Sequence, residues 1–254
     1  MFGFKDKVVA VTGSTKGIGR RIAERFYAEG ARVAVCGRSY APAMLAEIAS
    51  TGPGGEVSRL FGKAVDVRRV PELQAFVTDA IAAFGRIDVL VNDSGIYQPM
   101  PHFEVTEEIW DNAMSVNVKS YFFAAQAFAR HVRERGGGGA IVNIASTNSL
   151  SVTRNNAVYT TSKAAVAMLT RSLALDWSDL GIRVNAVAPG STPTDINAAI
   201  YADDNKLKGL QERIPMHRQG TRDEMANAVL FLASDLSSYT TGQILFVDGG
   251  WLLQ

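Results

Sequence analysis

Short apolar runs alternate with longer helical patterns along the whole chain, and this alternation constrains the fold more than any other feature. Several of the runs are apolar at nearly every position, as expected for strands covered on both faces of a parallel sheet. The candidate strands cover residues 7–13, 31–37, 63–67, 86–92, 139–146, 182–190 and 242–250. The helical patterns cover residues 17–29, 41–50, 71–84, 106–135, 157–179 and 223–233.

This order predicts an α/β protein built from right-handed βαβ units. Residues 1–254 contain no internal repeat, no linker rich in Pro or Ser and no break in composition. We therefore expect a single domain of Rossmann type, with a doubly wound parallel sheet of about seven strands and helices on both faces.

Composition excludes several classes of protein. Hydrophobic residues make up 47% of the chain, charged residues 20%, and the formal net charge is +1, so nothing indicates disorder or a nucleic-acid partner. No apolar stretch approaches the length of a membrane span, and the first residues lack a signal-peptide pattern, so we expect a cytoplasmic protein without a membrane partner. One cysteine, Cys36, and three scattered histidines predict neither a disulfide nor a metal site.

A glycine loop, TGSTKGIG at Thr12–Gly19, follows the first candidate strand. Gly13 permits a tight turn, Gly17 lets the backbone approach a phosphate, and Gly19 allows the helix to pack closely on the sheet. The helix that begins near Gly17 would direct its free N–H groups at a pyrophosphate. The loop therefore favours dinucleotide binding, although a plain tight turn uses similar residues.

Polar or glycine-rich segments follow four of the strands. They are the loop at 12–19, NDSG at 92–95, STNS at 146–149 and PGSTPTD at 189–195. The carboxyl ends of parallel strands meet at one rim of the sheet, and ligands bind there where the strand order reverses. The sequence therefore predicts a cleft lined by these segments.

Tyr159 and Lys163 are four residues apart in a helical pattern, AVYTTSKAAV at 157–166. Both side chains should lie on one helix face, with Cβ atoms about 5–6 Å apart. Taken alone, the pair is as compatible with the solvent-exposed face of an ordinary helix as with a proton-transfer site.

Together these segments resemble the short-chain dehydrogenase/reductase family, from about Lys7 to Gly250. The pieces that match, in family order and spacing, are the loop at 12–19, N-x-x-G at 92–95, Asn117, Ser146, Y-x-x-S-K at 159–163, and Pro189-Gly190 followed by Thr194. Members are single-domain oxidoreductases, commonly homotetramers, that use NAD or NADP. The resemblance implies an enzyme that interconverts a secondary alcohol and a ketone or aldehyde by hydride transfer.

The resemblance also implies a role for each catalytic residue. Tyr159 would be the general acid–base, Ser146 would bind the substrate oxygen, and Asn117 would hold a water that links Lys163 to solvent. Free tyrosine titrates near pH 10, so catalysis at neutral pH requires its pKa to fall by roughly three units. Lys163 and the oxidised nicotinamide are the expected causes. Ser146 and Asn117 also have purely structural interpretations, as hydroxyl and amide groups that satisfy the backbone.

The cofactor site implied by the resemblance contains many residues. Asp66 would meet the adenine edge, Asn92 would brace the loop, and Thr194 would hold the carboxamide. The full set is Gly13, Ser14, Thr15, Lys16, Gly17, Ile18, Gly19, Arg38, Asp66, Val67, Asn92, Ser94, Gly95, Tyr159, Lys163, Pro189, Gly190, Thr192 and Thr194. The chain departs from the family pattern at Asp93, Ser94 and Thr192.

The end of the second strand, CGRS, favours NADP over NAD. Gly37 stands where a relative that prefers NAD would carry Asp, and Arg38 follows it. Arg38 and Lys16 are two cations suited to the 2′-phosphate of NADP. NAD remains the alternative, because both side chains are also compatible with a solvated surface.

The expected substrate walls are Ile96–Phe103, Thr147–Asn156 and Ser191–His217. The second wall offers Thr147, Asn148, Arg154, Asn155 and Asn156, which favour a hydroxyl-rich small molecule such as a sugar or polyol over a wholly apolar one. The same polar side chains are also compatible with an ordinary solvent-exposed loop.

Two alternative functions stay open. One is 3-oxoacyl-carrier-protein reductase, for which a basic patch of Arg130, Arg133, Arg135 and Arg171 would receive the acidic carrier. The other is a dinucleotide-sensing scaffold without turnover, although such a protein would have no need to keep the tyrosine and the lysine.

The runs at 121–129 and 164–177 are apolar on more than one helix face, beyond what a single core-facing stripe requires. The resemblance assigns both to subunit contacts and places the C-terminal residues 244–254 at a second interface. We therefore expect a homotetramer with two-fold symmetry.

Overall fold

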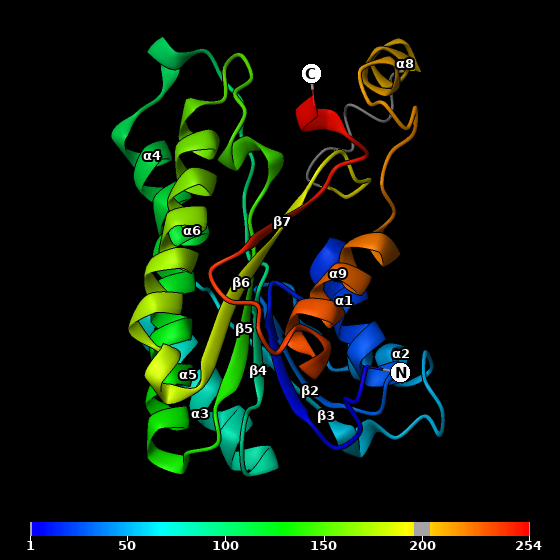
Figure 1. The fold of residues 1–254 in the computed structure, drawn as a ribbon, viewed down its shortest axis with the longest axis vertical. Helices are drawn as coiled ribbons and strands as arrows, with labels where there is room; N and C mark the ends of the chain where they lie inside the picture. The colour runs from blue at the N-terminus through cyan, green and yellow to red at the C-terminus, as the bar shows by residue number, and fades with distance from the viewer. Residues whose placement is uncertain (1, 196–203, 254) are drawn as a thin grey trace.

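The computed structural model describes residues 2–195 and 204–253, and within them one parallel sheet has the strand order β3-β2-β1-β4-β5-β6-β7 (Figure 1). The predicted α/β fold, a doubly wound sheet of seven strands, is confirmed. The strands are β1 Val8–Thr12, β2 Arg32–Gly37, β3 Leu60–Ala64, β4 Val89–Asn92, β5 Gly139–Ile144, β6 Ile182–Pro189 and β7 Ile244–Val247.

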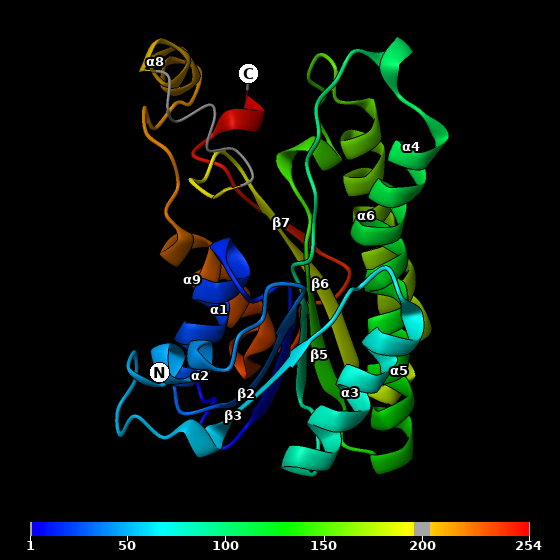
Figure 2. The ribbon, with the colours of Figure 1, turned by 180° about the vertical axis from the view of Figure 1, so that it is seen from behind.

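Helices cover both faces of the sheet (Figures 1 and 2). One face carries α1 Gly17–Ala28, α2 Ala43–Ala49 and α9 Arg222–Ala233. The other carries α3 Val70–Phe84, α5 Ser120–Arg135 and α6 Ala157–Asp176. Two further helices, α4 Glu107–Met114 and α8 Asp204–Glu212, lie toward the end of the molecule at which β6 finishes.

The apolar strands form two hydrophobic cores, one on each side of the sheet. Along β1, Val9 and Val11 pack in the core that contains α1 and α9, whereas Val8 and Ala10 pack in the core that contains α3 and α5. Successive side chains of a strand point to opposite faces, so a strand between two helical layers must be apolar at every position. This explains why the strands were recognisable from the sequence.

The expected helix at 106–135 is interrupted. It consists of α4, a single π-helical turn at Ser115–Lys119, and α5. A π-turn inserts one extra residue without disturbing the amphipathic pattern on either side, so hydrophobic periodicity did not reveal it. The helix expected at 157–179 ends earlier, at Asp176, and a short 3₁₀ turn at Ser178–Leu180 leads to Gly181 in the left-handed region.

The strand expected at 63–67 was placed wrongly by three residues. β3 is Leu60–Ala64, and the chain then leaves the sheet. Val65 and Val67 are buried and flank the partly exposed Asp66, which imitates the alternation of a half-buried strand. The backbone instead turns there, with the Arg69 N–H donating to the Asp66 carbonyl at 2.9 Å.

Helix α8 was not predicted, because its sequence is mostly polar and shows no clear apolar stripe. The expected substrate wall at 191–217 falls partly outside the described residues, which cover only 191–195 and 204–217 of it. Among the described helices, none is both long enough and apolar enough to cross a membrane.

Candidate active site

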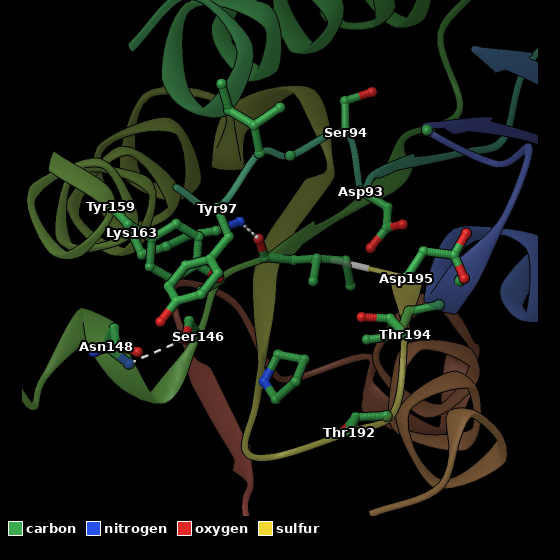
Figure 3. Close-up of a pocket in the computed structure, with 18 of the residues that line it drawn as sticks. Asp93, Ser94, Tyr97, Ser146, Asn148, Tyr159, Lys163, Thr192, Thr194 and Asp195 are labelled. Carbon is green, nitrogen blue, oxygen red and sulfur yellow. Dashed lines mark hydrogen bonds between the residues drawn. The ribbon is translucent and has the colours of Figure 1, made fainter. Parts of the chain in front are cut away.

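A cavity of about 520 Å³ lies at the carboxyl ends of β1, β4, β5 and β6 (Figure 3). The segments that follow these four strands all contribute to its lining, as the order of polar segments predicted. The position is the switch point of the sheet, where β1 has β2 on one side and β4 on the other. Its volume suits a small-molecule ligand.

Most of the predicted site residues line this cavity. They are Gly13, Thr15, Lys16, Gly17, Ile18, Arg38, Asp66, Val67, Ser94, Gly95, Ser146, Tyr159, Lys163, Pro189, Gly190, Thr192 and Thr194. The other four, Ser14, Gly19, Asn92 and Asn117, do not reach the lining, and their hydrogen bonds or close packing support the segments that do.

Ser14 and Asn92 brace the strand ends beneath the cavity. The Ser14 hydroxyl donates to the Val11 carbonyl at 2.8 Å and accepts from the Cys36 N–H at 3.0 Å, which ties the loop to β1 and β2. The Asn92 amide donates to the side chain of Asn143 at 2.9 Å, joining β4 to β5. Both side chains fix the path of the backbone from the buried side.

The glycine loop needs glycines for two reasons. Gly13 and Gly17 have φ angles of +68° and +64°, which other residues rarely adopt. A Cβ atom on Gly13 would lie 2.7 Å from the backbone nitrogen of Ser94, and one on Gly19 would lie 2.6 Å from the Gly13 carbonyl oxygen.

Helix α1 begins at Gly17, and its N-cap residue, Lys16, provides no side-chain hydrogen bond to the first turn. The backbone N–H groups of the first turn therefore have no side-chain cap. Together with the close-packed loop beside them, they can bind a pyrophosphate. The residues present therefore fit a dinucleotide.

Gly13→Ala should destabilise the protein by about 2 kcal/mol more than Gly85→Ala. Both glycines have positive φ angles, +68° and +82°, so both variants carry the strain of an alanine at positive φ, about 1–2 kcal/mol. Only at Gly13 would the new methyl group overlap backbone, because nothing lies within 4 Å of a Cβ at Gly85. Urea unfolding of both variants measures the difference, and equal losses would show that the loop tolerates a side chain.

Tyr159 lies on α6 with its ring edge against Tyr97, at a centroid distance of 4.9 Å and an interplanar angle of 81° (Figure 3). A hydrogen bond joins its hydroxyl to that of Ser146 and lowers its pKa, but burial outweighs this effect and raises the pKa to about 12. The expected lowering by Lys163 is therefore not produced by the protein groups. The lysine amine lies 5.8 Å from the centre of the tyrosine ring and donates instead to the Ile144 carbonyl at 2.7 Å.

Lys163 is buried and shares its surroundings with Asp93, one of the departures from the family pattern. Burial lowers the pKa of Lys163 to about 8, and the charge of Asp93 opposes that change. Burial raises the pKa of Asp93 to about 7, against the effects of Lys163 and of a hydrogen bond from the Gly19 N–H. A carboxyl whose pKa is raised by burial and an amine whose pKa is lowered by burial thus face one cavity (Figure 3).

Asn117 lies in the π-turn, fully buried, and joins the segment after β4 to α6. Its Oδ1 accepts from the Ile96 N–H at 2.9 Å, and its Nδ2 donates to the Ile96 carbonyl at 3.0 Å and to the Ser162 hydroxyl at 2.9 Å. Because three hydrogen bonds hold the amide, it positions the backbone before Tyr97. The water-holding role expected for Asn117 stays a prediction.

The expected NADP-selecting residues have different surroundings. Arg38 is exposed at the end of β2 and lines the cavity, whereas Lys16 pairs with Asp195 at 3.3 Å. A Cβ atom on Gly37 would lie 2.8 Å from the Thr15 side chain, so the loop leaves no room for an aspartate there unless Thr15 moves. Asp66, expected at the adenine edge, is held by the Arg68 guanidinium at 2.9 Å, which lowers the pKa of its carboxyl.

The lining residues that had no role predicted from the sequence include Asp195, Arg213 and Trp251. Asp195 and Arg213 lay within the proposed wall at 191–217 and were given no role. Trp251 belongs to an apolar C-terminal run that had been assigned to a subunit interface. No spacing or motif links Trp251 to Arg213, so only the folded chain brings the pair to the cavity.

Comparisons with known proteins match nearly the whole chain. A family model described as enoyl-(acyl carrier protein) reductase matches residues 13–252. The 2-dehydro-3-deoxy-D-gluconate 5-dehydrogenase of Escherichia coli is 34% identical over 99% of this chain and 97% of its own. The chain belongs to the short-chain dehydrogenase/reductase family.

Two other members of the short-chain dehydrogenase/reductase family show how close the similarity is. Glucose 1-dehydrogenase 2 of Bacillus subtilis is 39% identical over 97% of this chain and 95% of its own. The crystal structure of a gluconate 5-dehydrogenase from Burkholderia cenocepacia, in complex with NADP and tartrate, superimposes with a TM-score of 0.91 at 34% identity, covering 100% of this chain and 98% of that one. The predicted enzyme class, an NAD(P)-dependent alcohol dehydrogenase or ketoreductase, is confirmed.

Proposed function

We propose that this short-chain dehydrogenase/reductase oxidises one secondary hydroxyl of a sugar, or of a close sugar derivative, with NADP. The observation that carries the proposal is the meeting of Ser146, Tyr159 and Lys163 on one wall of the cavity, with the glycine loop among its other walls. That arrangement brings a proton-transferring hydroxyl to the same space as the dinucleotide site.

The reaction divides between the cofactor and the protein. A nicotinamide dinucleotide held by the glycine loop and by Lys163 at its ribose would supply the hydride acceptor for the carbinol carbon and positive charge near Tyr159. The Ser146 hydroxyl binds the substrate oxygen, and Tyr159 as tyrosinate takes the hydroxyl proton, leaving a ketone. Lys163 would add the positive charge of its amine to the same buried space. Alcohol and NADP⁺ thus give ketone, NADPH and one proton.

A hydroxyl-rich substrate is supported by the polar lining and by the relatives. Thr147, Asn148 and Arg154 line the cavity, and the buried Nδ2 of Asn148 has no partner among the described residues, so it is available to a substrate oxygen. Asn155 and Asn156, also expected in this wall, do not line the cavity. The named relatives act on glucose and on a dehydro-deoxy-gluconate.

The alternative functions have less support. In the basic patch expected for an acyl carrier, Arg135 is used inside the fold, where it donates to the carbonyls of Ile87 and Gly138. A scaffold without turnover would not need a tyrosine, a serine and a lysine on one cavity wall. Comparison of kcat/KM for aldoses, polyols, sugar acids and acyl thioesters tests the proposal. A preference for acyl thioesters would contradict it.

NADP is the preferred cofactor in this proposal, as in the NADP complex of the Burkholderia cenocepacia relative. Arg38→Ala should lower kcat/KM with NADP by about tenfold or more, because a charge-assisted hydrogen bond to the 2′-phosphate is lost, and should change kcat/KM with NAD by less than about twofold. Arg32→Ala, at the opposite end of β2, is the matched control. A wild type that favours NAD by more than about tenfold would overturn the assignment.

We also propose a homotetramer in the cytoplasm. On α6, Met168 and Leu175 are 61% and 78% exposed, and Leu253 at the C-terminus is 85% exposed, so apolar side chains remain uncovered on both expected interfaces. The single cysteine is buried and unpaired, which suits a reducing compartment. Light scattering at micromolar concentration should give four chain masses, and a monomeric mass would reject the assembly.

A further inference from the structure

The cations that line the cavity differ in what they contact. Lys16 pairs with Asp195, and Lys163 donates to the Ile144 carbonyl, so both have protein partners. The described contact of Arg213 is with an aromatic ring, since its guanidinium carbon lies 4.6 Å from the centroid of the Trp251 ring. Arg213 is therefore a cation that is held in place without being neutralised by that contact.

Close packing between two distant segments fixes this stack. Arg213 follows α8, and Trp251 follows β7. The Met216 N–H donates to the Gly249 carbonyl at 3.1 Å. A Cβ atom on Gly250 would lie 3.0 Å from the Pro215 ring, so a side chain at that position would push the segments apart.

Asp248 is the carboxylate that follows β7, and it holds the turn that carries Trp251. It accepts from the backbone N–H groups of Gly250 at 2.9 Å and Leu252 at 3.1 Å. Its negative charge thus stabilises the turn. A ligand carboxylate would complement the positive charge of Arg213.

A stacked guanidinium is well suited to one kind of ligand group. The guanidinium carbon lies over the indole ring, and a guanidinium carries its N–H groups in one plane, in the geometry that binds a carboxylate through two parallel hydrogen bonds. A neutral hydroxyl group can be bound without a cationic partner. A carboxylate loses hydration when it enters a cavity, so it needs a positive charge beside it.

We propose that Arg213, stacked on Trp251, binds the carboxylate of the substrate, which is therefore an anionic sugar acid rather than a neutral sugar. This inference rests on the proposed function, because the hydroxyl that reacts is the one bound by Ser146 and Tyr159. The relative from Burkholderia cenocepacia, named a gluconate dehydrogenase, is in complex with tartrate, a hydroxy acid. A sugar acid with its carboxylate at one end presents a distant hydroxyl to the proton-transferring side chains.

The test compares D-gluconate with sorbitol, which has the same six-carbon chain with a hydroxymethyl group in place of the carboxylate group. Wild type should favour gluconate in kcat/KM, and Arg213→Gln should lower kcat/KM for gluconate on the order of 100-fold, mainly through KM, with less than about threefold change for sorbitol. Arg133→Gln, on the exposed side of α5, is the control. Arg213→Lys keeps the positive charge but lacks the planar guanidinium, so its kcat/KM for gluconate should lie between those of wild type and Arg213→Gln. This variant gives a second test if Arg213→Gln does not fold.

Binding without turnover separates this inference from the function on which it rests. In the presence of NADPH, which cannot accept a hydride, gluconate should raise the unfolding temperature of wild type and of Arg133→Gln but not that of Arg213→Gln. Equal stabilisation of wild type and Arg213→Gln would overturn the inference, as would loss of the gluconate preference in Arg154→Gln alone. Stabilisation by gluconate that depends on Arg213, with no turnover of any sugar derivative, would support the carboxylate site and reject the proposed reaction.

Discussion

Tyr159→Phe should lower turnover by roughly 10²–10⁴-fold while the affinity for NADP changes little, since a positioned general acid–base contributes about that much. The variant removes the hydroxyl that meets Ser146 and keeps the ring edge against Tyr97. Packing on α6 should therefore survive. Steady-state turnover and NADP titration by fluorescence measure the two quantities separately.

Tyr97→Phe is the matched control for that variant. It also removes one hydroxyl from the same cavity and keeps the other half of the edge-to-face pair. Because no proton transfer is assigned to Tyr97, its loss should lower turnover less than about tenfold. Similar losses in the two variants, or more than about a tenth of wild-type turnover in Tyr159→Phe, would remove Tyr159 from the acid–base role.

Lys163→Met should damage turnover and cofactor binding together. Methionine is unbranched and fills a similar volume, but it can neither donate to the Ile144 carbonyl nor supply positive charge beside Tyr159. We expect a loss of at least about 100-fold in kcat, as for other removals of preorganised charge, and an increase of at least about tenfold in the Kd of NADP.

Lys119→Met provides the comparison, because this lysine lies in the exposed part of the π-turn. It should leave both quantities within about twofold of wild type. An unchanged Kd for NADP in Lys163→Met would show that the lysine acts on the tyrosine alone, and unchanged turnover would exclude it from catalysis.

Much of the fold could be predicted because its determinants are local. A strand between two helical layers must be apolar throughout, as in Val8–Thr12, and a glycine loop at its end is visible in a single sequence. The convergence of polar segments on one rim then follows from the handedness of βαβ units. For that reason many of the cavity residues after β1, β4, β5 and β6 are predictable from the sequence.

The remainder depended on information that is not local. The π-turn at Asn117 preserves the helical pattern on both sides. Val65 and Val67 are buried in the core that contains α3, although they lie outside β3. Arg213 and Trp251 meet only because Gly249 and Gly250 allow two distant segments to touch. The pKa of Tyr159 depends on burial of its side chain. The four-residue spacing of Tyr159 and Lys163 along a helix gives no information about that burial.

The central claim is that this cavity transfers a hydride from a sugar-type carbinol carbon to NADP while Tyr159 takes the hydroxyl proton. The most direct measurement supplies NADP and a substrate that carries deuterium on the reacting carbon, and determines the mass of the reduced cofactor. The reduced cofactor should carry one deuterium, and almost none should appear in it when Tyr159→Phe is used for the same time. Cofactor that is reduced without deuterium, or NADP that binds and stays oxidised with every sugar and sugar acid tested, would contradict it.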